Sequence, residues 1–297
     1  MRSTIYPAVL SAAVIATSAM TLAACNSIGG TSGPTTDAAV TTSVDSQPGG
    51  TNAQSTVRTV GKTGWYGGLD IIVNKATVVP SQSGGGQLLI DITYQNTTSE
   101  VRRLSDHTYL QIGEEIDAGA VFDSPTVSGK DSAAVKVTTT VASTKDLDRL
   151  LDTVTVVYGQ ASDNQTKIPI AAAAQVESIQ PQALNITGTL VQNQTTIEIT
   201  GGKLSPSYKR NQRNKMDIEL PLEISGESYI SGDYFTVRTP SGQIVVADVR
   251  VPDYENVVVP ATAVFVVPNP ATGPYVLTYD SSRGKGRPAP TLSFTIG

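Results

Sequence analysis

Short runs in which apolar and polar residues alternate cover most of the chain after residue 57. In the first part, apolar side chains recur at every second position in the runs 69–73, 88–94, 135–137, 154–158 and 168–170. In the second part, the same pattern covers 197–199, 216–224, 245–251, 263–267, 275–279 and 292–296. A period of two is typical of a β-strand with one buried face. The pattern therefore predicts an all-β protein.

Turns rich in Gly and Pro separate these runs, and many short strands at such spacing predict β-sandwiches. Pro221 cannot donate a backbone hydrogen bond, so the run 216–224 is expected to be an edge strand or to carry a bulge. One short helix is expected between two strands of the first part. There, Ser143-Thr144-Lys145-Asp146 resembles a capping box, and Leu147, Leu150 and Leu151 form an apolar stripe.

The two parts also share an order of elements. A strand, a turn and a strand follow one another in 69–95 and again in 196–223. An alanine run at 171–174, followed by Pro181, places the boundary between them at about 171–180. We therefore expect two tandem immunoglobulin-like β-sandwich domains, residues 58–178 and 179–297, related by internal duplication.

The N-terminus has the layout of a secretory signal peptide. Arg2 provides a positive charge, an apolar run covers 8–19, and small residues lead to Ala24. The apolar run is shorter than the roughly 20 residues that a spanning helix needs, and Ser and Thr dilute it. An uncleaved transmembrane anchor is the alternative.

Leu22-Ala23-Ala24-Cys25 resembles the lipobox of bacterial lipoproteins. The resemblance implies that 1–24 is a lipoprotein signal peptide and that Cys25 carries a diacylglycerol, with palmitate as a typical acyl chain. The partner of Cys25 is then the lipid bilayer, and the protein is lipid-anchored on the extracytoplasmic face of the cell membrane. Two acyl chains hold a protein on a membrane more firmly than one, which binds reversibly. The alternative is an ordinary signal peptide with a cysteine nearby. Cys25 is the only cysteine, so no disulfide is available.

Residues 25–57 follow as a disordered tether rich in Ser, Thr and Gly. They show no apolar periodicity, so little burial is available to offset the entropy of ordering. Random-coil scaling gives such a linker a typical reach of about 30 Å.

The first part is similar to an immunoglobulin-like family of Gram-positive secreted antigens and lipoproteins. The similarity lies in Trp65-Tyr66, in the strand 89–98 that ends in Asn-Thr-Thr, and in the strands 135–141 and 151–159. It implies an exported, non-enzymatic binding or scaffolding module, and it supplies no catalytic residues.

Candidate catalytic and metal-binding residues are few. His107 is the only histidine, and in Ser105-Asp106-His107 adjacent side chains on a strand would point to opposite faces, so a catalytic triad is not favoured. With one His and one Cys, no metal site with nitrogen and sulfur ligands and no cofactor are expected. Glu114, Glu115, Asp117 and Asp123 are interpreted as a solvated acidic loop, although paired carboxylates of a glycan hydrolase stay open. Four Asn-x-Thr sequons, at Asn96, Asn164, Asn185 and Asn193, carry little weight in a bacterial chain.

The net charge is −5, which does not favour a nucleic-acid partner for an exported protein. Residues 58–178 carry 10 basic and 14 acidic residues, and residues 179–297 carry 10 of each. Two loops concentrate basic residues: Lys209, Arg210, Arg213 and Lys215 in one, and Arg283, Lys285 and Arg287 in the other. They are candidate sites for an anionic envelope polymer or for lipid headgroups, and the alternative is a solvated hairpin loop.

Three hypotheses follow. The first is a non-enzymatic binding or scaffolding lipoprotein of the cell envelope, with an envelope protein or polymer as its partner. The second is an envelope glycan hydrolase that uses loop carboxylates. The third is a carrier of a small ligand or polymer. A pocket with converging carboxylates favours the second, a deep apolar cavity the third, and smooth sandwich surfaces the first.

Overall fold

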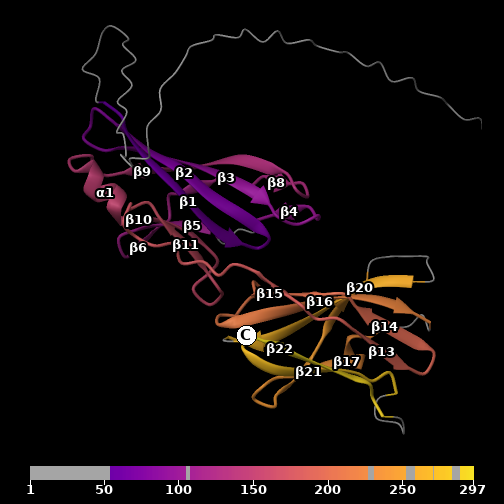
Figure 1. Cartoon of the computed structure of the whole chain (residues 1–297). Helices are drawn as coiled ribbons and strands as arrows, with labels where there is room; N and C mark the ends of the chain where they lie inside the picture. Colours follow the sequence, from indigo (N-terminus) through magenta and orange to yellow (C-terminus); the bar gives the residue numbers. More distant parts are fainter. Residues whose placement is uncertain (1–53, 105–107, 227–230, 252–257, 270, 283–287) are drawn as a thin grey trace, which may run out of the picture. The chain divides into compact units, whose positions relative to one another are not determined.

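The computed structural model describes residues 54–104, 108–226, 231–251, 258–269, 271–282 and 288–297 (Figure 1). The predicted signal peptide, Cys25 and nearly all of the predicted tether lie outside these residues. The described chain is built from antiparallel sheets and one short α-helix, so the all-β prediction is confirmed. We call residues 54–178 the first half and 179–297 the second half.

The first half contains two main sheets, with strand orders β1-β2-β3-β9-β7 and β11-β10-β5-β6, and a small β4-β8 pair. Its strands are β1 (Thr56–Tyr66), β2 (Leu69–Pro80), β3 (Gly86–Asn96), β4 (Arg102–Arg103), β5 (Thr108–Ile112), β6 (Glu115–Asp117), β7 (Val121–Phe122), β8 (Thr126–Val127), β9 (Ser132–Val141), β10 (Val154–Tyr158) and β11 (Thr166–Pro169).

The second half also contains two sheets. In the larger one, β16 pairs with β20 along one side and with β15 and β14 along the other. β19 pairs with the opposite edge of β20. The smaller sheet has the order β18-β17-β21-β22. The elements are β12 (Gln182–Leu184), β13 (Gly188–Gln192), β14 (Thr195–Ile199), β15 (Gly202–Pro206), β16 (Lys215–Ser225), the 3-10 helix η1 (Gly232–Tyr234), β17 (Phe235–Arg238), β18 (Ile244–Val246), β19 (Asp248–Arg250), β20 (Val258–Pro268), β21 (Gly273–Tyr279) and β22 (Thr291–Ile296).

Strand pairing repeats between the halves. Thr56 faces Val78, and Gln182 faces Leu204, each 126 positions further along. In both halves, the pairing register also shifts by one residue partway along the equivalent hairpin. In the first half, the shift falls between Val73 and Lys75 of β2, in its pairing with β3. In the second half, β14 and β15 both pair with β16, and the shift falls between the end of β14 and the start of β15. The second half therefore carries two strands and a break where the first has one bulged strand.

Each half buries its own hydrophobic core between its two sheets. The first core draws on 66–170 and the second on 184–296. The alternating runs supply the inward faces, and each fully buried Leu, Ile, Val or Phe contributes about 1.5–3 kcal/mol. One residue crosses this division, because Tyr208 of the second half packs against the first core. Whether the halves fold as separate domains stays a prediction.

The expected helix is present as α1 (Leu147–Thr153), which connects β9 of one sheet to β10 of the other. Its N-cap is Asp146, whose carboxylate accepts a hydrogen bond from the Arg149 N–H, so the helix begins later than a cap at Ser143 would place it. Leu151 is buried and anchors the helix to the core.

Two details of the strand prediction were wrong. The strand β16 that contains Pro221 is central, because β20 pairs along its whole length. On the other side, β14 ends opposite Leu222 and β15 begins opposite Glu219, so Pro221 lies in the gap between them. The run 245–251 is two strands, β18 and β19, which belong to different sheets, and buried Ala247 lies between them.

The strand β1 was not predicted, and it takes the last two residues of the expected tether, Thr56 and Val57. Its outer edge is covered by the segment that follows β11. The Lys62 ammonium donates to the backbone carbonyls of Pro169 (3.0 Å), Ala171 and Ala174 (2.7 Å). Burial lowers the pKa of Lys62. Covering an edge in this way blocks unwanted strand pairing.

Candidate functional site

Two polar side chains of the first half hold a loop of the second half. The Asn164 amide donates to the carbonyls of Ser207 (2.8 Å), Lys215 (2.7 Å) and Gln212 (3.2 Å), and its Oδ1 accepts from the Asn214 N–H (3.0 Å). The neighbouring Asp163 Oδ1 accepts from the Asn211 N–H at 2.7 Å. We call this set of contacts between 163–164 and 207–215 the latch.

The latch loop is one of the two predicted basic loops. The Lys209 ammonium binds the Asp248 carboxylate at 2.9 Å, which lowers the pKa of Asp248. The Arg213 backbone N–H donates to the Ser162 carbonyl at 3.2 Å, and Arg210 is exposed. The backbone of the loop is therefore held against the first half, while the side chains of Arg210 and Arg213 are exposed. The other predicted basic residues, Arg283, Lys285 and Arg287, lie outside the described residues.

Three aromatic rings pack beside the latch. The Tyr208 ring centroid lies 5.6 Å from that of Trp65 and 4.2 Å from that of Tyr66, and its hydroxyl donates to the Trp65 carbonyl at 3.4 Å. Burial, reinforced by the nearby Asp163 charge, raises the pKa of Tyr66 to about 12. The indole ring of Trp65 and the phenol rings of Tyr66 and Tyr208 therefore pack together where the two halves meet, and Trp65 and Tyr66 are buried there.

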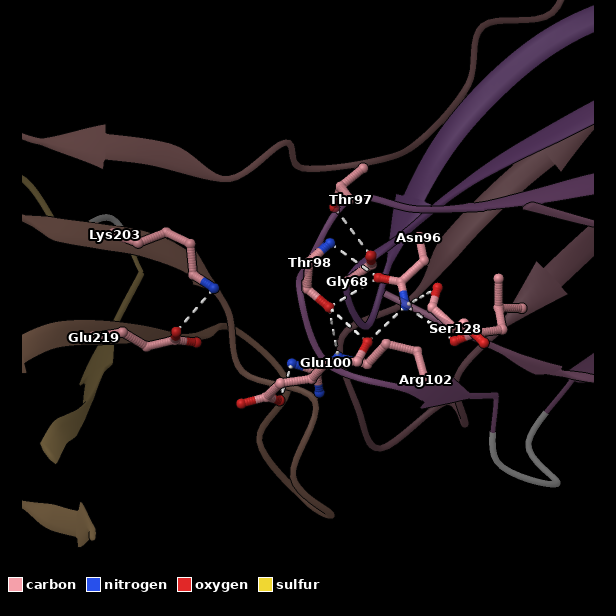
Figure 2. Close-up of polar contacts among 10 residues, drawn as sticks. Gly68, Asn96, Thr97, Thr98, Glu100, Arg102, Ser128, Lys203 and Glu219 are labelled. Carbon is pink, nitrogen blue, oxygen red and sulfur yellow. Dashed lines mark hydrogen bonds and ion pairs between the residues drawn. The ribbon is translucent and has the colours of Figure 1, made fainter. Parts of the chain in front are cut away.

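A cleft with a volume of about 490 Å³ lies next to these rings. The first half contributes Trp65, the Gly67-Gly68 turn and the segment around Thr98 to Arg102. The second half contributes residues of β15, β16, β19 and β20, with the start of the latch loop. Figure 2 shows the polar contacts on both sides. Seven charged side chains line the cleft, against two in a cavity beside β6 and α1 and one in a cavity beside β12.

The wall from the first half is organised by Asn96, which is 2% exposed. Its amide donates to the carbonyls of Glu100 (2.7 Å), Val127 (3.0 Å) and Ser128 (3.0 Å), and its Oδ1 accepts from the Thr98 N–H and hydroxyl (Figure 2). This network fixes the turn that places Glu100 and Arg102 at the cleft.

An ion pair completes that wall. The Arg102 Nη2 lies 2.9 Å from the Glu100 Oε2, and its Nε donates to the Thr98 hydroxyl at 3.3 Å. The guanidinium is therefore held at two points rather than one. It is a positioned cation at the cleft surface, with 36% of its side chain exposed.

The wall from the second half carries a matching pair. Lys203 on β15 and Glu219 on β16 are direct cross-strand partners, and their Nζ and Oε2 atoms lie 2.8 Å apart. The exposed Arg250 of β19 also lines the cleft. Each half therefore presents one ion pair to the same cavity.

Asp217 lies two residues before Glu219 and on the same face of β16, yet it is only 9% exposed. Burial raises the pKa of its carboxyl group, and the neighbouring Ser207 hydroxyl, with the Lys209 and Arg250 charges, offsets part of that rise. Its Oδ1 has no hydrogen-bond partner, and neither do Trp65 Nε1 and Ser207 Oγ. These three are the buried side-chain atoms without partners in the described chain, and all lie at or next to the cleft.

A second cavity of about 510 Å³ shares Trp65, Thr98 and Lys203 with the cleft. It continues along Thr97 to Ser99 on one side and the start of β12 on the other. The two cavities therefore follow the contact between the halves on both sides of these shared residues.

The predicted catalytic candidates are not brought together at this site. His107, with Ser105 and Asp106, lies outside the described residues. Glu114 and Glu115 are exposed, and Asp117 accepts hydrogen bonds from the Thr139 hydroxyl and the Gly119 N–H. Within the described ranges, no three His, Cys, Asp or Glu side chains form a group that could hold a metal ion.

Of the residues that line the cleft, Trp65 and Lys209 stood out in the sequence, but the residues that organise its walls were missed. Asn96 and Asn164 stood out only as sequons, whereas each organises a set of backbone groups. An Asn followed by Thr at the end of a strand is also a signal for a side-chain-stabilised turn, because Asn bonds readily to nearby backbone.

Comparisons with protein-family models, with curated proteins and with solved structures found no match to this chain. Among the residues that the structure describes, none forms a helix with the length and apolar character required to span a bilayer.

Proposed function

We propose that this protein is a lipid-anchored, non-enzymatic binding protein of the cell envelope, and that the cleft between its halves is its ligand site. The observation that carries the proposal is the cleft itself. Both halves wall it, each presents a positioned ion pair, and the latch joins the halves beside it. Clefts with a few convergent polar groups are the usual place for ligand binding.

The strand orders support immunoglobulin-like domains. In the first half, β2-β3-β9-β7 and β11-β10-β5-β6 correspond to the immunoglobulin orders A-B-E-D and G-F-C-C′. In the second half, β16-β20-β19 and β22-β21-β17-β18 occupy the same positions, with β14 and β15 together in place of the first strand. The shared 126-residue offset supports an internal duplication. Sandwich modules of this type commonly bind partners at their surfaces.

The anchor is proposed from Leu22-Ala23-Ala24-Cys25 and its resemblance to a lipobox. Diacylglyceryl-Cys25 would hold the protein on the extracytoplasmic face of the membrane, with residues 26–55 as the tether. The ligand is then an envelope protein or polymer within reach of that tether.

The test is a pull-down of solubilised envelope components with the full-length protein. The Arg102→Met/Lys203→Met variant removes one cation from each wall of the cleft. Lys75→Met is the matched control, because Lys75 forms a similar cross-strand pair with Asp91 (3.2 Å) away from the cleft. A further variant carries Gln at the four basic positions of the latch loop. The proposal predicts that the double variant loses partners that the control keeps. If all variants retain the same partners, the cleft is not the binding site.

A glycan hydrolase is the second candidate, favoured by one observation. The raised pKa of buried Asp217 suits a general acid, and Glu219 and Glu100 line the same cleft. Release of reducing ends from envelope glycans that is abolished by Asp217→Asn would establish this activity. Absence of release by the unmodified protein would remove it.

A further inference from the structure

The cleft presents opposite charges in pairs rather than a surface of one sign. Four basic side chains line it, Arg102, Lys203, Lys209 and Arg250, together with the acidic Glu100, Asp217 and Glu219. A polyanion that approached the cations would also meet the carboxylates beside them, and such like-charge contacts disfavour binding. The lining therefore does not match an anionic polymer.

The two ion pairs are open to exchange. The side-chain exposures are 36% and 73% for Arg102 and Glu100, and 38% and 29% for Lys203 and Glu219. Pairs exposed to this degree contribute only about 0–1 kcal/mol, so a ligand can replace them at little cost. A ligand that carries both positive and negative charges could break both pairs and still give each of the four side chains an oppositely charged partner.

The cavities favour an extended ligand over a single headgroup. The cleft and the second cavity share Trp65, Thr98 and Lys203, so a chain can follow the contact between the halves past these residues. Trp65 Nε1 is an unpartnered donor and Asp217 Oδ1 an unpartnered acceptor, the pair of groups that a peptide backbone complements. Both atoms are buried in this structure, so a ligand reaches them only if the walls move apart.

We propose that the cleft binds an extended peptide segment that carries both acidic and basic side chains. Its carboxylates would pair with Arg102 and Lys203, and its ammonium or guanidinium groups with Glu100 and Glu219. This inference rests on the proposed binding role of the cleft and specifies the chemistry of its ligand.

The test is calorimetric titration of the full-length protein in detergent micelles with capped peptides of equal length. The probes are an alternating Glu-Lys peptide, an all-Glu peptide and a neutral Gly-Ser peptide, with polyphosphate as a polyanion. The alternating peptide is expected to bind at least about tenfold more tightly than each of the others. Lys203→Met is expected to reduce that affinity by up to about fivefold, and Lys75→Met to leave it unchanged.

Three results would overturn the inference: equal binding of the alternating and neutral peptides, tighter binding of polyphosphate or the all-Glu peptide, or equal effects of the Lys203 and Lys75 variants. The second result would assign the cleft to an anionic polymer. If cleft variants lose envelope partners in the pull-down but no peptide binds, the ligand class fails while the binding role of the cleft stands.

Discussion

Replacing Asn164 by Ala tests whether the latch holds the two halves together. The substitution removes both amide hydrogens and the Oδ1 acceptor, which together engage four backbone groups of the 207–215 loop. Two amide hydrogens can make two full hydrogen bonds, and Oδ1 makes a third. At about 0.5–1.5 kcal/mol each, Asn164→Ala should lower the free energy of unfolding by about 1.5–4.5 kcal/mol.

Trp65 is the natural probe for this measurement, because it is the only tryptophan and packs against Tyr208 next to the latch. Urea unfolding followed by its fluorescence gives the free energy, and circular dichroism follows the sheets as a whole. Asn185→Ala is the control, since Asn185 is exposed and its side chain makes no hydrogen bond within the described part of the chain. A loss below about 0.5 kcal/mol for Asn164→Ala, equal to that of the control, would refute the role given to the latch.

Three further substitutions test other parts of the account. Burial raises the pKa of Asp217, so the folded state binds a proton at this site more tightly than the unfolded state does. The stability gained from this proton is complete below the ordinary pKa of about 3.9 and is lost as the pH rises through the raised pKa of the folded state. Asp217→Asn should therefore raise the melting temperature at neutral pH and lose this advantage near pH 3, and an equal effect at both pH values would contradict the assignment. Gly68→Ala should destabilise more than Gly84→Ala: both have φ near +90°, but only at Gly68 would the new Cβ lie 3.0 Å from Thr98 and 3.2 Å from Arg102. The strain common to both is about 1–2 kcal/mol, and equal losses in thermal unfolding would exclude the crowding. Cys25→Ser should move the protein from the membrane fraction to the soluble fraction, and retention on membranes would return the transmembrane alternative.

Period-two patterns predicted most of the fold because a strand with one buried face records its geometry directly in the sequence. The hairpin of β21 and β22 follows this rule, with Tyr275 opposite Phe294 and Leu277 opposite Leu292. β1 was missed because the inward positions before Trp65 include Thr56, Arg58 and Lys62, so no apolar alternation marks the strand, and its pairing with β2 is a tertiary contact. Pro221 misled the strand placement because a central strand tolerates it only in the gap between the end of β14 and the start of β15, which is a tertiary property.

The candidate site was less visible than the fold. Its cations and carboxylates come from segments about 100 residues apart, and only tertiary contact shows that Arg102 and Lys203 share a cleft. The basic loop was noticed for its charge, but its role in the structure depends on backbone groups that Asn164 binds. Backbone recognition by a side chain leaves no charge or apolar pattern, so it could not be predicted from composition.

Hydrogen–deuterium exchange in the presence of envelope ligand tests the central claim most directly. The full-length protein would be measured alone and with the envelope components that it retains in the pull-down. The account predicts that one complex protects both 97–102 of the first half and 202–206 of the second half, because these segments form opposite walls of the cleft. Protection confined to one half, or to surfaces away from both segments, would contradict it.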